Sequence, residues 1–139
     1  MSTFILDDAV LQRLIKVSPE MVDKAIRATA FDVAANAINL AKVATGAMRA
    51  SIFVKTSKGS DVSQAEQAAN YMNPNTEFSD PTPGNPPLMT AYVAPGVNYA
   101  VFQEFGKPSQ PNYPYKPFMT PAIENADRKF EEYLKKVFE

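Results

Sequence analysis

The sequence predicts an α+β fold, with a long N-terminal helix and a C-terminal helix packed on a small, mainly antiparallel β-sheet with long proline-rich loops. Apolar residues recur at helical spacing over residues 19–44 and 120–138. Two segments between them, 51–57 and 88–94, have the pattern of strands. Of the 12 prolines, 11 lie between Pro74 and Pro121, where they disfavour helix interiors and central strands.

The N-terminal third is predicted to be helical. Residues 7–17 start with acids and form a short amphipathic helix. Ser18 and Pro19 then suit the cap and first position of a second helix, which we expect to end at Thr45-Gly46, where glycine accepts a left-handed conformation. Its core stripe consists of Met21, Val22, Ala25, Ile26, Thr29, Ala30, Val33, Ala34, Ala37, Ile38 and Ala41.

The middle of the chain alternates strands with loops. Residues 51–57 alternate apolar and other side chains, as a half-buried strand does. Residues 59–87 are expected to form a long surface loop, with one or two helical turns around 63–71 capped by Asp61. The second strand, 88–94, stops at a Pro-Gly pair.

The region after the second strand returns to a helix at the C-terminus. Residues 98–105 fit either a strand or a short helix, and residues 106–117 fit no regular structure. Thr120 is expected to cap the last helix and Pro121 to begin it. Three acid–base pairs four residues apart favour a solvent-exposed outer face: Glu124 with Arg128, Glu131 with Lys135 and Glu132 with Lys136.

Length and charge narrow the class of protein. With 139 residues, we expect a single domain over 1–139, with 59–87 and 107–117 as extended loops. The 14 basic and 15 acidic residues give a net charge of -1, which argues against a general nucleic-acid binder. No apolar run approaches the ~18 residues of a membrane span. The N-terminus lacks the basic residues of a secretory signal, so we expect no membrane partner and synthesis in the cytosol.

The chain contains neither cysteine nor histidine. Disulfides, thiolate nucleophiles, Cys/His zinc sites and imidazole bases are therefore excluded, and we expect no catalytic residue, cofactor or metal. Glu104, within an aromatic stretch, is either an acid with a raised pKa or part of a structural ion pair, and we favour the ion pair. Lys58-Gly59-Ser60 lacks the spaced glycines of a phosphate loop and is read as a turn, while Glu77 and Asp80 are expected to be solvated.

Aromatic residues concentrate between residues 92 and 118. Only Lys107 and Lys116 accompany them, which is too few basic residues for stacking on single-stranded nucleic acid. A core with a protein interface is the better interpretation, because aromatic residues are favoured interface anchors. The candidate interface residues are Lys107, Tyr113, Tyr115 and Lys116.

Three short motifs, in order, resemble one known family. The first spans residues 45–52, the second 99–106 and the third 117–122. Their characteristic residues are Thr45, Gly46, Met48, Arg49 and Ser51, then Tyr99, Glu104, Phe105 and Gly106, then Pro117, Phe118 and Pro121. This order resembles the tail-completion or head–tail joining proteins of tailed bacteriophages, also labelled neck or minor tail proteins. Lys107 stands where the family often has threonine, and 59–87 follows no family pattern.

The resemblance implies a non-enzymatic virion structural protein that assembles in the host cytoplasm. It would sit at the neck, between head and tail, as a ring of six copies, as the six-fold symmetry of tails implies. Its partners would be head connector or stopper proteins on one side and tail terminator or tail tube proteins on the other. DNA would only pass through the lumen.

Alternatives remain open at this point. A first alternative is a tail terminator that caps the tail tube. The others are a carboxylate-dependent hydrolase that uses Glu104 and a cellular adaptor that binds through its proline and tyrosine loop. Physically, Gly46 and Gly106 let the backbone turn, and we expect Arg49 to pair with Glu104. The loops 59–87 and 107–117 are expected to bind partners or neighbouring subunits.

Overall fold

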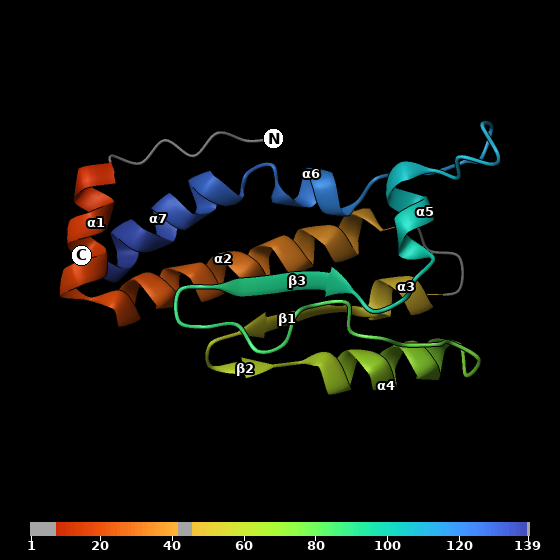
Figure 1. Cartoon of the computed structure of the whole chain (residues 1–139), viewed down its shortest axis with the longest axis horizontal. Helices are drawn as coiled ribbons and strands as arrows, with labels where there is room; N and C mark the ends of the chain where they lie inside the picture. The colour runs from red at the N-terminus through yellow and green to blue at the C-terminus, as the bar shows by residue number, and fades with distance from the viewer. Residues whose placement is uncertain (1–7, 42–45, 139) are drawn as a thin grey trace.

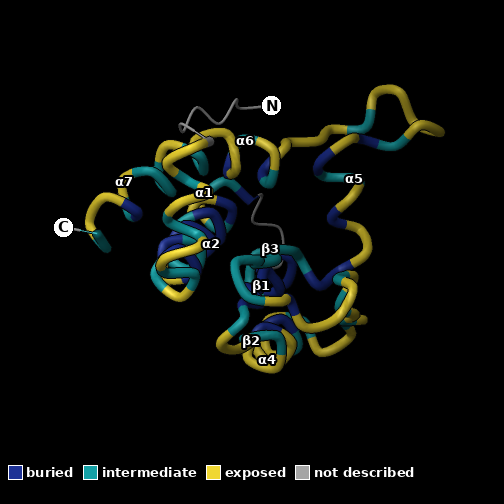
Figure 2. Tube along the Cα trace, turned by 60° about the vertical axis from the view of Figure 1, so that its left-hand side comes forward, coloured by how far each residue is buried: buried dark blue, intermediate teal, exposed yellow. Residues whose placement is uncertain are grey.

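The computed structural model describes residues 8–41 and 46–138, and it confirms the α+β class. A small sheet lies between a layer of long helices and a single helix on its other side (Figures 1 and 2). The helical layer consists of α1 (Asp8–Val17), α2 (Pro19–Leu40) and α7 (Ala126–Phe138). The other elements are α3 (Ala47–Ala50), β1 (Ile52–Thr56), β2 (Gly59–Ser60), α4 (Val62–Met72), β3 (Ala91–Pro95), α5 (Ala100–Phe105) and α6 (Met119–Ile123).

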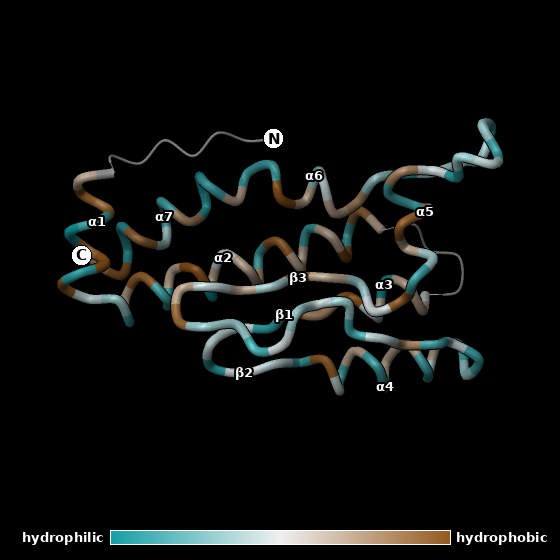
Figure 3. Tube along the Cα trace, viewed as in Figure 1, coloured by the Kyte–Doolittle hydropathy of each residue, from teal (hydrophilic) through white to brown (hydrophobic). Residues whose placement is uncertain are grey.

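Helix α2 is the centre of the core. Its predicted stripe is confirmed, because Val22, Ala25, Val33 and Ala37 are all buried. Apolar residues recur with each turn of α2 (Figure 3). Many of them are small, so the sheet packs closely against one side of α2 and α7 packs against the other. The C-terminal helix α7 thus packs along α2, whereas the sequence predicted packing on the sheet.

The ends of α2 differ from the prediction. The helix ends at Leu40, because Ala41 is already extended, with φ -65° and ψ 137°. Gly46 is left-handed as expected, with φ 82°, but it precedes α3 and does not end α2. Thr45 lies outside the described residues. At the other end, the Ser18 side chain makes no capping hydrogen bond, and its carbonyl accepts the N–H groups of Met21 and Val22, both at 3.2 Å.

The sheet has the order β2-β1-β3 and is antiparallel throughout. Val54 of β1 lies opposite Val93 of β3, and the second strand begins at Ala91, later than predicted. All five residues of β1 are buried, so the half-buried expectation is wrong. Both faces of β1 are covered, one by α2 and the other by α4 and the segment that carries Phe78.

Residues 59–87 are not one long surface loop. The hairpin turn is Ser57-Lys58, and Gly59 and Ser60 form β2, so of the predicted turn Lys58-Gly59-Ser60 only Lys58 lies in the turn. Helix α4 then packs against β1 and α3 and exceeds the one or two turns expected. The Asp61 side chain does not cap α4, because its Oδ1 atom accepts the Val54 N–H at 2.6 Å. Residues 59–72 therefore belong to the folded body, whereas residues 73–87 contain no helix and no named strand.

The predicted C-terminal helix is two helices. Helix α6 ends at Ile123 and α7 begins at Ala126 after a turn at residues 124–125, and the Asn125 carbonyl accepts the Lys129 N–H at the start of α7. Thr120 lies inside α6 and does not cap it, since the cap position belongs to Phe118. Of the predicted surface pairs, Glu131 and Lys135 lie 3.5 Å apart, whereas Glu132 pairs with Lys129 at 3.6 Å in place of Lys136.

None of the helices in the described part of the chain is both long and apolar enough to cross a membrane.

Candidate functional site

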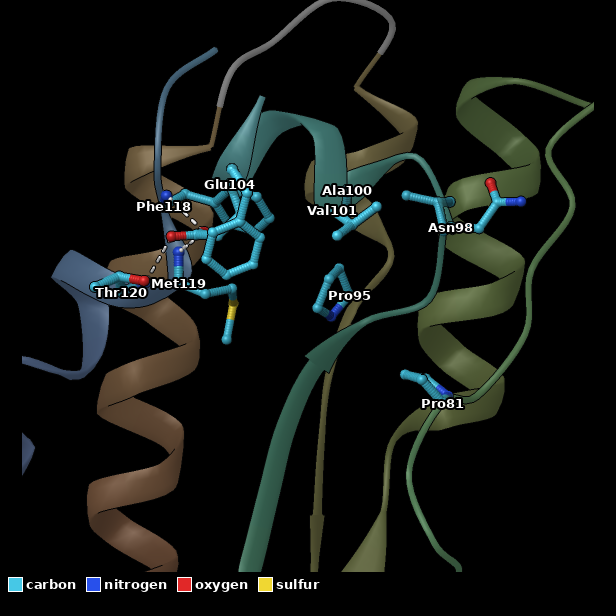
Figure 4. Close-up of a pocket in the computed structure, with 11 residues that line it drawn as sticks. Pro81, Pro95, Asn98, Ala100, Val101, Glu104, Phe118, Met119 and Thr120 are labelled. Atoms are coloured by element: carbon cyan, nitrogen blue, oxygen red, sulfur yellow. Dashed lines mark hydrogen bonds between the residues drawn. The ribbon is translucent and has the colours of Figure 1, made fainter. Parts of the chain in front are cut away.

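The centre of the candidate site is the Glu104 side chain, which α5 presents towards the start of α6 (Figure 4). Its Oε1 atom accepts the N–H groups of Phe118 at 3.0 Å and Met119 at 2.8 Å, and its Oε2 atom accepts that of Thr120 at 3.1 Å. The first N–H groups of a helix have no partner within the helix, and they favour a negative charge. Glu104 therefore caps α6 from a different helix.

The surroundings of Glu104 keep it ionised. Burial alone would raise its pKa, but the Thr120 hydroxyl and the three amides outweigh burial and hold the pKa below its usual value. The expected ion pair is thus wrong, since the partners are backbone amides. The raised-pKa interpretation is wrong as well. A carboxylate of lowered pKa, with both oxygens bonded, lacks the proton that a general acid needs at neutral pH.

Arg49 does not pair with Glu104, contrary to expectation. Its Nε atom donates to the Ile38 carbonyl at 2.7 Å, near the end of α2. In the same motif, Met48 is buried, and the Ser51 hydroxyl donates to the Met48 carbonyl at 2.6 Å and accepts the Gly96 N–H at 3.2 Å. The described part of this motif therefore connects α2, α3 and the end of β3.

An arm, residues 107–117, leaves the body after α5 and returns at Phe118. It contains no helix or strand, as predicted, and stands out from one end of the molecule with most of its length exposed (Figures 1 and 2). Gly106 starts it with φ 77°, and a Cβ atom there would lie 3.0 Å from the Tyr115 ring. Glycine is thus needed where the chain turns outward.

The arm is braced at its base. The Lys107 ammonium lies 5.0 Å from the centre of the Phe102 ring and 4.7 Å from that of Tyr113. The Gln103 amide also donates to the Tyr113 hydroxyl at 3.1 Å. Of the four predicted interface residues, Lys107 and Tyr113 therefore hold the base, whereas Tyr115 and Lys116 are exposed further along.

Beside the arm lies an apolar groove of about 350 Å³ between α5, the start of α6 and the end of β3 (Figure 4). Pro81, Pro95 and Val97 line it on the side of the sheet, and Val101 and Phe105 on the side of α5. Val101 is 51% exposed and Phe105 is 72% exposed. The second motif thus combines a buried cap, Glu104, with exposed apolar residues that are available for contact.

Comparison with known protein families finds a match over residues 8–106. They match the family model described as "Bacteriophage HK97-gp10, putative tail-component". The chain belongs to this HK97 gp10-like family. The match contains the first two motifs and ends at Gly106, so the arm, α6 and α7 lie beyond it. No curated protein and no solved structure matches the chain.

Two buried charges of this HK97 gp10-like chain were not foreseen from the sequence. Asp23 is fully buried on α2 and accepts bonds from the Met89 N–H at 2.6 Å, the Ser57 hydroxyl at 2.7 Å and the Arg27 Nε at 3.0 Å. Burial would raise the pKa of Asp23, but these bonds hold it below its usual value. The only sequence signal was an acid next to the apolar stripe.

Lys55 is the second buried charge, on the face of β1 that meets the segment after α4. Its Nζ atom lies 2.8 Å from Asp80 and 2.8 Å from the Thr82 hydroxyl. Asp80 is therefore not simply solvated as expected. Burial would raise its pKa, but the bonds from Lys55 and Thr82 lower it overall. Within the described residues, no group of three acidic side chains is placed to hold a metal ion.

Proposed function

We propose that this chain is a tail completion protein, which joins the head connector to the tail tube as a ring of six copies. The observation that carries the proposal is the family match, because it extends over residues 8–106 and the family is one of bacteriophage tail components. A tail component is part of the virion. The neck position and the ring are inferred from the resemblance of the three motifs to tail-completion proteins.

The geometry of the site supports binding and not turnover. Glu104 is engaged in capping α6, so its carboxylate fixes the base of the arm. The exposed surfaces beside it are an aromatic arm and an apolar groove, both suited to protein contact. In the proposed ring, such surfaces would contact neighbouring subunits, the head connector or stopper above, and the tail terminator or tail tube below. DNA would pass through the lumen.

Electron microscopy of lysates from a phage with a nonsense mutation in this gene tests the proposal. We expect filled or leaking heads beside separate, finished tails, because only the joint would be missing. Expression of the wild-type chain in the host should restore joined particles and serves as the control. Tails of abnormal length would point to a tail terminator instead. Intact, infectious particles would contradict any essential role in the neck.

A further inference from the structure

The prolines of the arm follow a regular period. They occupy positions 108, 111, 114 and 117, which are every third residue. A polyproline II helix has three residues per turn, so prolines at this spacing share one edge where the chain is extended. Turns lie within residues 108–112, where the Gln110 N–H donates to the Lys107 carbonyl and the Tyr113 N–H to the Gln110 carbonyl, so only Pro114 and Pro117 lie in a stretch without turns. In the second half of the arm, Tyr113 and Lys116 each precede a proline, which restricts them to extended conformations. Residues 113–117 are therefore preorganised as an extended, proline-edged ligand.

The groove has the chemistry that such a ligand requires. Proline-rich extended segments bind in hydrophobic grooves with aromatic walls. The groove contains the aromatic residues Phe105 and Phe118 and is otherwise lined mainly by apolar side chains. Its volume of about 350 Å³ lies within the ~300–1,000 Å³ of pockets that hold ligands. No residue of the arm lines it, so the arm of the same copy does not fill it.

Charge complements the apolar fit. The arm carries two lysines and no acid, and Lys116 is exposed. Glu77 is also exposed, and it directly precedes Phe78, whose antiparallel bridge to Val97 joins this segment to the lining of the groove. Among the ion pairs of the described residues, none involves Lys116 or Glu77.

We propose that the arm of one copy binds in the groove of a second copy, with Tyr115 beside Val101 and Lys116 facing Glu77. The arm points away from its own body (Figures 1 and 2), and the Lys107 and Gln103 contacts hold its base in that direction. Arm and groove are different surfaces, so the contact is head-to-tail and closes a ring when the rotation between copies allows it. The inference rests on the proposed ring and names the contact that builds it.

Disulfide trapping tests the contact directly, because the chain has no cysteine of its own. The double variant Val101→Cys/Tyr115→Cys would be supplied to the nonsense-mutant phage, and purified particles would be oxidised. We expect a ladder of covalent oligomers longer than a dimer that reductant collapses. The matched control, Val101→Cys/Tyr71→Cys, keeps one groove cysteine and moves the other to Tyr71, an 87%-exposed residue outside the groove, and should give no ladder.

The outcomes separate the contact from the function. Infectious particles of the double variant without a ladder would overturn the arm-in-groove contact and leave the neck function standing. A product that stops at the dimer would also overturn it, because a symmetric contact cannot extend. The proposed neck function is tested separately by the nonsense mutant without any supplied variant, and intact particles from that mutant would contradict it.

Charge reversal provides a second test that does not depend on cysteines. Lys116→Glu and Glu77→Lys should each lower particle yield by about tenfold or more, because every contact in the ring would then place like charges together. The combined variant restores opposite charges at every contact and should recover most of the yield. Thermal unfolding of each variant checks that the fold is intact. If the combined variant gave no more particles than the single variant with the lower yield, the proposal would be overturned.

Discussion

Glu104 holds Met119 by a hydrogen bond of 2.8 Å from the Met119 N–H to its Oε1 atom. The bond joins α5, inside the family match, to α6, beyond it. Because Glu104 also bonds to Phe118, the two ends of the arm are held together, as in a compact surface loop whose ends lie close. One carboxylate therefore sets both the start of α6 and the base of the arm.

Replacing Glu104 by glutamine should weaken the fold. The glutamine amide keeps one acceptor oxygen, but its NH2 group replaces the other. That NH2 group would face a backbone N–H that donates to a carboxylate oxygen in the wild type. We expect a loss of about 1–3 kcal/mol in the free energy of unfolding at pH 7, measured by urea denaturation. Glu124→Gln, at an exposed position, is the control and should change little. Equal stability of the Glu104 variant and the wild type would contradict the capping role.

The same cap should make stability depend on pH. Because the pKa of Glu104 is lowered in the folded chain, its contribution is complete above the usual value of 4.5 and is lost as pH falls through the folded value. The stability gap between wild type and Glu104→Gln should therefore narrow in acid. Unfolding free energies at pH 7, 5, 4 and 3 would show this, and a gap of constant size would argue against an ionised cap.

Local patterns predicted much of the fold. Helices α1 and α2 and strands β1 and β3 follow from periodicity and from proline, which act over neighbouring residues. The cap of α6 did not follow, because Thr120-Pro121 offers a plausible local start, whereas the actual acceptor lies 14 to 16 residues earlier. Helix ends are set by such contacts, and these are visible only once α5 and α6 are placed together.

The buried charges were missed for the same reason. Asp23 meets Met89 across 66 residues, and Lys55 meets Asp80 across 25. Aspartate and lysine are residue types that are mostly exposed, so neither position on its own predicts burial. In the candidate site, the aromatic residues predicted an interface, but the groove depends on how β3, α5 and α6 meet.

Asp23 should be among the most sensitive positions. Its carboxylate connects α2, the β1–β2 hairpin and the left-handed Met89, whose φ is 65°. Asp23→Asn removes the charge from a fully buried site with three donors, and we expect a loss of roughly 3 kcal/mol in unfolding free energy. Hydrogen exchange at the Met89 amide should accelerate. Glu20→Gln, on the same helix, is the control, because it removes only a surface ion pair with Lys58 and an exposed charge in the first turn of α2, both small contributions.

The effects of substituting Lys55 and Asp80 on the free energy of unfolding should be strongly non-additive. Asp80→Asn leaves the buried Lys55 ammonium without its counter-charge, and we expect a loss of about 1–3 kcal/mol. Lys55→Met in the same chain removes that stranded charge, so the double variant should be more stable than Asp80→Asn alone. A thermal-unfolding cycle of the four proteins measures the coupling. Additive effects would mean that the two groups do not depend on each other.

Gly96, directly after β3, tests how closely the backbone there packs against the Phe78 ring. A Cβ atom at Gly96 would overlap the Phe78 ring, which packs against Phe53 with ring centres 6.1 Å apart. We therefore expect Gly96→Ala to destabilise the fold by about 1–3 kcal/mol, as overpacking does. Gly59→Ala is the matched control, because nothing lies within 4 Å of a Cβ atom there. If Phe78 is the cause, shortening it in Gly96→Ala/Phe78→Leu should cost less than the sum of the single changes, and additive costs would contradict this explanation.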